Sequence, residues 1–194
     1  GCNTCTYLDE RTMQPVAFST SDALMAVLPS VTSAQDRSVG VSALTSMAAA
    51  KLGVTSTNFS NTSFTPPNTP ITTASLNTAV STVLDIFGVS GNDTANADLM
   101  FSKPVVYGVN SKAEDKLSGT GSSLNIGVLL TALAKSTPVG TPLIKQSSSL
   151  SQVLYLSFQD PSVNVKTNIA SGNLISDFSN KLNEVKQKNL DAAS

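Results

Sequence analysis

The residues that could carry chemistry in this chain are few, and the first of them are two cysteines near its start. Cys2 and Cys5 are the only cysteines, in the order Cys-Asn-Thr-Cys. A redox pair needs a thiolate whose pKa is lowered by a helix N-terminus or a cation, and the stretch after Cys5 has no helical pattern. A zinc site needs two further soft ligands. The pattern favours a disulfide between Cys2 and Cys5, with a covalent link to a partner chain as the alternative.

Lipid attachment is a further alternative for Cys2. The dipeptide Gly1-Cys2 resembles the end of a bacterial lipoprotein signal, after which the cysteine carries the lipid. Cleavage there would leave the cysteine first, whereas Gly1 still precedes it. Because the chain starts without a methionine or an apolar leader, we expect a processed or excised polypeptide.

One loop has enough oxygen-bearing side chains to be considered as a calcium site. Calcium takes roughly six to eight oxygen ligands, and the candidate donors are Asn92, Asp93, Asn96 and Asp98. The spacing of an EF-hand and its final glutamate are missing, so an ordinary capped turn is the favoured interpretation. We predict no cofactor and no other metal site.

The chain lacks the residues that most enzymes use for catalysis. The chain contains no histidine, which removes Ser-His-Asp and Cys-His catalysis and the commonest general base near neutral pH. The carboxylate pairs Asp9/Glu10 and Glu114/Asp115 are adjacent in sequence, and adjacent side chains usually point apart rather than across a substrate. The sequence therefore predicts a protein that is not an enzyme.

The composition limits the kinds of partner that the protein can bind. Only 13% of the 194 residues are charged and the formal net charge is -1. Without a basic excess we expect no nucleic-acid binding. Electrostatic self-repulsion is weak at this charge, so self-assembly or binding to other proteins is permitted. No apolar run is long enough for a transmembrane helix.

The elements that must position these residues are mostly helical. Residues 1–20 are predicted to form an extended segment or hairpin with a turn at Asp9–Thr12, and residues 21–194 a single helical domain. Apolar residues at spacings of three and four predict a bundle-like domain of five to six helices. The helical segments are Ala23–Leu28 (capped by Ser21-Asp22), Ala43–Leu52 (ended by Gly53), Leu76–Phe87 (capped by Thr72-Thr73), Leu124–Leu133, Leu150–Phe158 and Ser171–Asn189, with Ser111–Leu117 as a short charged candidate. The clearest apolar stripe is formed by Leu76, Val80, Val83, Leu84 and Phe87. The segment Leu150–Phe158 could also be a buried strand, and a helix is the favoured interpretation.

Four segments resemble a known class of protein module. They are Thr6–Thr12, Val39–Ala49, Ile86–Gly88 and Gly127–Ala134. Together they resemble helical modules of large secreted surface proteins and lipoproteins of Gram-negative bacteria. The resemblance implies an extracellular location and a structural or adhesive role, and it implies no catalytic residue.

These observations lead to three functional hypotheses. The first is a secreted or cell-surface structural or interaction module, such as an adhesin or a filament subunit. The second is a surface lipoprotein that binds a ligand in an apolar pocket between its helices. The third is a thiol-disulfide protein that uses Cys2 and Cys5.

Overall fold

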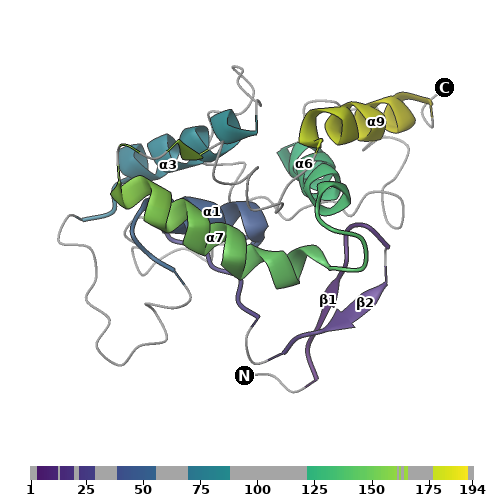
Figure 1. Ribbon diagram of the computed structural model, residues 1–194, viewed down its shortest axis with the longest axis horizontal. Helices are drawn as coiled ribbons and strands as arrows, with labels where there is room; N and C mark the ends of the chain where they lie inside the picture. The colour runs from purple at the N-terminus through teal and green to yellow at the C-terminus, as the bar shows by residue number, and fades with distance from the viewer. Residues whose placement is uncertain are drawn as a thin grey trace, which may run out of the picture.

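The computed structural model describes residues 4–12, 14–19, 22–28, 39–55, 70–87, 122–160, 162, 164–165 and 177–191. Within these residues the fold is mainly α-helical, as the sequence predicts, with five helices and one two-stranded antiparallel sheet (Figure 1). The elements are β1 (Thr6–Leu8), β2 (Pro15–Ala17), α1 (Ala43–Lys51), α3 (Thr73–Ile86), α6 (Ser122–Ser136), α7 (Leu143–Gln159) and α9 (Phe178–Asp191).

Helix α1 is the central element of the core. Ser42 caps its first turn and forms a capping box with Thr45. Every residue from Ala43 to Ala50 is buried, so the helix is covered all round rather than on the single apolar face that the sequence predicts. Gly53, with φ of 85°, ends the helix in a left-handed conformation that an L side chain disfavours.

Helix α3 has the apolar stripe that its sequence predicts. Thr72 and Ser75 form a second capping box, which satisfies backbone N–H groups of the first turn. The predicted stripe residues are all buried, and they are Leu76, Val80, Val83, Leu84 and Phe87. Burial of a side chain of this size contributes about 1.5–3 kcal/mol as an upper estimate, so this stripe attaches α3 to the core against α1.

Helices α6 and α9 pack against each other at the other side of the molecule (Figure 1). Phe178 at the start of α9 contacts Phe87 at the end of α3, with ring centroids 5.0 Å apart. Lys135 and Glu184 form an ion pair between the two helices at 3.3 Å. The aromatic contact joins the α6–α9 pair to the same apolar core as α1 and α3.

Helix α7 packs along α1 and confirms the helical interpretation of Leu150–Phe158 (Figure 1). It begins earlier than predicted, at Leu143, directly after the loop that contains Pro138, Gly140 and Pro142. Its buried face mixes leucines with serines: Leu150 and Leu154 are fully buried, and so is Ser147. Small residues on this face allow a close approach to the alanine-rich α1.

The predicted helix Ala23–Leu28 is wrong. The segment 22–28 is not helical, because Met25 exchanges backbone hydrogen bonds with side chains of α1 instead of with its own neighbours. Its N–H donates to Ser46 Oγ at 2.8 Å, and its carbonyl accepts from Thr45 Oγ1 at 2.6 Å. Helix α9 begins at Phe178, directly after Asp177, whose φ of 56° is not helical. The predicted start of this helix near Ser171 lies outside the described residues.

Candidate interaction site

The predicted turn between the two strands is present and is organised around one carboxylate. In the β1–β2 hairpin, Tyr7 is paired with Val16. Asp9 is 3% exposed and accepts hydrogen bonds from Thr12 Oγ1 at 2.6 Å and from Thr12 N at 3.2 Å. Its backbone N–H donates to the Gln14 carbonyl at 3.0 Å. The turn is therefore held by its own aspartate, which is how Asp commonly stabilises a tight turn.

Arg11 attaches this turn to the C-terminal end of α6. Its Nε donates to the Ala134 carbonyl at 3.0 Å and its Nη1 to the Pro138 carbonyl at 3.1 Å. Its Nη2 donates to the carbonyls of Ala134 and Thr137. The last carbonyls of a helix lack helical partners and carry partial negative charge. A planar guanidinium with several donors matches them well, so Arg11 caps α6 from 123 residues away in sequence.

A second polar link lies just after the hairpin. Lys145 of α7 forms an ion pair with Asp22, whose side chain is only 4% exposed, and also donates to Ser19 Oγ at 3.2 Å. Desolvation of Asp22 tends to raise its pKa, but hydrogen bonds from Lys145 and Ser19 outweigh it and hold the pKa below the ordinary value of 3.8. Asp22 thus bonds to α7, and caps no helix of its own.

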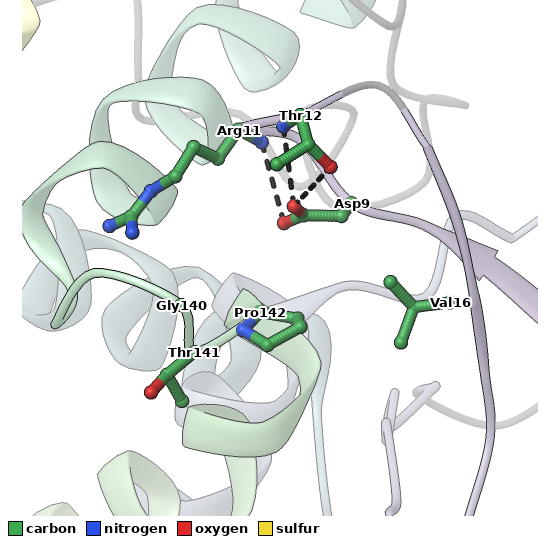
Figure 2. Close-up of a pocket in the computed structure, with 7 residues that line it drawn as sticks. All are labelled: Asp9, Arg11, Thr12, Val16, Gly140, Thr141 and Pro142. Atoms are coloured by element: carbon green, nitrogen blue, oxygen red, sulfur yellow. Dashed lines mark hydrogen bonds between the residues drawn. The ribbon is translucent and has the colours of Figure 1, made fainter.

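A small hollow lies between the hairpin and the loop that joins α6 to α7 (Figure 2). Its volume is about 180 Å³, and it is lined by Asp9, Arg11, Thr12, Val16, Gly140, Thr141 and Pro142. Pockets for drug-sized ligands measure roughly 300–1,000 Å³. The hollow therefore accommodates a single side chain or a very small molecule, and it is too small for a larger ligand.

The loop beside the hollow carries the most exposed large hydrophobic residue of the described chain. Val139 is 96% exposed, compared with 57% for Leu156 and 45% for Val41. Gly140, with φ of 83°, makes the sharp turn that follows it. We call the two strands, the turn Asp9–Thr12 and the loop Thr137–Pro142 the hairpin end of the molecule.

Glu10, in the same turn, is a partly buried carboxyl group whose pKa is strongly raised. Burial raises its pKa to about 8, and a hydrogen bond from its own backbone N–H offsets this in part. The Tyr7 hydroxyl donates to Glu10 Oε2, and the Tyr7 ring meets Phe18 edge-to-face with centroids 6.3 Å apart. Glu10 and Asp9 therefore have different partners, as expected for adjacent carboxylates.

The other residues that the sequence singles out lie mostly outside the described part. Cys5 is exposed just before β1, and its predicted partner Cys2 lies outside the described residues, so the disulfide and the lipid anchor stay predictions. The proposed calcium ligands also lie outside them, and they are Asn92, Asp93, Asn96 and Asp98. So do the acidic pair Glu114/Asp115 and the short helix Ser111–Leu117.

Within the described residues, three or more acidic, cysteine or histidine side chains nowhere gather as metal ligands. None of the helices described combines the length and apolar character needed to cross a bilayer. Comparison with known proteins found no match: no family model fits the chain, and no curated protein or solved structure is significantly similar to it.

Sequence reasoning missed Arg11 and Lys145, which make the polar links of the hairpin end. Arg11 was treated only as part of a turn, and no partner in the distant α6–α7 region was assigned to it. One signal was available: Arg11 is one of only two arginines in a chain with few charges. Such a rare guanidinium inside a tight turn favours a specific structural partner.

Proposed function

We propose that the protein is a non-enzymatic structural or interaction module of the cell surface or extracellular space, and that the hairpin end is its contact surface. The single observation that carries the proposal is the attachment of the hairpin by Arg11 to the Ala134 carbonyl of α6 and to the Thr137 and Pro138 carbonyls of the loop that follows. This attachment fixes an exposed hairpin and an exposed loop relative to the helical core.

A contact surface binds more tightly when its loops are already ordered before the partner binds. Ordering a flexible loop during association costs free energy that is subtracted from the affinity. At the hairpin end this ordering is already complete, because Arg11 and Lys145 tie both ends of the hairpin to the α6–α7 region. An exposed Val139 then offers apolar area to a partner without rearrangement.

The charged groups of the hairpin end are used within the fold. All three nitrogens of the Arg11 guanidinium donate to carbonyl oxygens, and the Asp9 carboxylate accepts from the turn. Groups with their hydrogen bonds satisfied internally support shape and position rather than proton transfer. This distribution favours a contact function over catalysis.

The extracellular or cell-surface location rests on the composition. A surface with few charges and many Ser, Thr and Asn side chains is solvated without long-range repulsion, and a paired Cys2 and Cys5 would need an oxidising compartment. The ligand-binding alternative has less support, because the hollow of about 180 Å³ is smaller than typical ligand pockets.

A site-specific crosslinking experiment tests the proposed contact surface. A photoreactive benzophenone amino acid replaces Val139 in the full chain, expressed in the organism that encodes it. The matched control carries it at Leu156, an exposed position on α7. We expect discrete crosslinked protein adducts from position 139, at several times the yield from position 156, in the envelope or extracellular fraction. Equal yields at the two positions would remove the hairpin end as the contact surface.

A further inference from the structure

The hairpin end carries a projecting side chain and a hollow next to each other. Val139 is almost completely exposed, and the three residues that follow it line the hollow from one side. Asp9, Arg11, Thr12 and Val16 line it from the hairpin side (Figure 2). Because Val139 projects into solvent, it does not fill the hollow of its own chain.

The size and chemistry of the hollow suit an aliphatic side chain. A dry cavity of about 150 Å³ is known to hold a benzene-sized molecule, and this hollow measures about 180 Å³. Much of its lining is apolar, from Val16, Pro142 and the Cα of Gly140. A valine therefore fits in both size and polarity.

We propose that two copies of this chain associate through their hairpin ends, with Val139 of each copy inserted into the hollow of the other. When a projection and a matching hollow are neighbours on one surface, a two-fold axis between them makes both contacts at once. The resulting pair is closed and consists of two identical contacts.

Charge does not oppose this pairing. The loop residues Pro138, Val139 and Gly140 are exposed and uncharged. The Arg11 guanidinium and the Asp9 carboxylate already have partners within their own chain. With a formal net charge of -1 per chain, two copies repel each other only weakly.

The inference rests on the proposed function, since it names the partner of the same surface as a second copy of the chain. Analytical ultracentrifugation of the purified full chain, up to about 1 mM, tests it, because a contact of this size is weak. We expect a concentration-dependent dimer. Val139→Asp should weaken it at least tenfold, since a carboxylate cannot be buried without a partner. Leu156→Asp, at the other exposed apolar position, should leave the dimer unchanged.

A second variant fills the hollow instead of removing the projection. Val16→Phe enlarges a side chain that points into the hollow and leaves Val139 intact (Figure 2), and we expect it to weaken the dimer at least tenfold as well. An equal mixture of Val139→Asp and Val16→Phe contains one chain with an intact hollow and one chain with an intact Val139. The mixed pair recovers one of the two contacts, so it should associate more tightly than either variant alone.

A wild-type chain that stays monomeric at about 1 mM overturns the inference. So does equal weakening by Val139→Asp and Leu156→Asp, or a mixture no tighter than its components. If Val16→Phe does not fold, as judged by circular dichroism, the comparison of Val139→Asp with Leu156→Asp still tests the inference. A monomeric chain whose position 139 crosslinks to a different protein on cells would overturn the inference and leave the proposed function in place.

Discussion

The α1–α7 interface and the hairpin end are held together by different forces. Between α1 and α7 the contacts are nondirectional, made by fully buried residues such as Met47 and Leu154. The hairpin end has little such burial and is attached by directional bonds from Arg11 and Lys145. The interface between helices therefore determines whether the chain folds, and the polar bonds determine where the hairpin sits.

The two regions also differ in how completely their polar groups are satisfied. On α7, the hydroxyls of Ser147 and Ser151 are buried, and neither has a hydrogen-bond partner among the described residues. The Asp9 carboxylate at the hairpin end accepts several hydrogen bonds, and so does the Asp22 carboxylate just after the hairpin. Close packing between helices tolerates an unpaired hydroxyl, whereas a hairpin without a core of its own depends on its hydrogen bonds.

The largest effect on the free energy of unfolding is expected at the α1–α7 interface. Leu154→Ala removes a fully buried side chain of α7 and should lower the free energy of unfolding by about 3 kcal/mol, from lost burial and the remaining cavity. The measurement is urea denaturation followed by circular dichroism. On the same helix Leu156→Ala is the control, and its 57% exposed side chain should change the free energy by no more than about 0.5 kcal/mol. Equal losses in the two variants would contradict the assigned burial.

The second effect is a loss of stability confined to the hairpin end, and it shows whether the hairpin end and the helical core open independently. Arg11→Ala removes the hydrogen bonds from the hairpin to the Ala134, Thr137 and Pro138 carbonyls, and should reduce the free energy of hairpin opening by about 2 kcal/mol. Hydrogen exchange measures it at the N–H groups of Asp9 and Phe18, which bond across the hairpin.

Arg11→Lys provides the matched control for the guanidinium. Lysine keeps the positive charge but lacks the planar set of donors, so exchange should remain close to that of Arg11→Ala. Amides of α1 should stay protected in both variants. Full protection in Arg11→Lys would show that charge alone holds the hairpin, and lost protection in α1 would show that the two regions are not separable.

A third effect is a pH dependence confined to the hairpin end. The pKa of Glu10 is raised from 4.5 to about 8 in the folded chain. Its contribution to stability is therefore fully present below 4.5 and is lost as the pH rises through about 8. In Glu10→Gln, which keeps an acceptor for the Tyr7 hydroxyl, this loss should disappear. Hairpin opening by hydrogen exchange between pH 4.5 and 9, corrected for intrinsic rates, measures the difference.

Asp22 responds in the opposite direction. Its pKa lies below 3.8, so its contribution is present above 3.8 and is lost as the pH falls through the folded value. The two carboxyl groups together favour the attached hairpin most between 3.8 and 4.5. A carbon-13 titration that places Glu10 near 4.5, or identical pH profiles for wild type and Glu10→Gln, would rule out this account.

Predictions from the local sequence pattern are correct where a residue and its partner lie within a few positions of each other. Thr72, which caps α3, and Gly53, which ends α1, each act within one helical turn. The turn around Asp9 is equally local, and it was predicted for the same reason. By contrast, Ser21-Asp22 before an apolar run is a typical helix start, yet Asp22 bonds to Lys145, 123 positions away.

The sequence by itself determined the helical class of this protein, the core stripe of α3 and the position of the hairpin turn, because each depends on spacing within a short segment. Only the tertiary structure decided that α1 is covered on all sides, that segment 22–28 is not helical, and that Arg11 caps α6. These features need groups that are far apart in the chain, and no local spacing records which of them will meet.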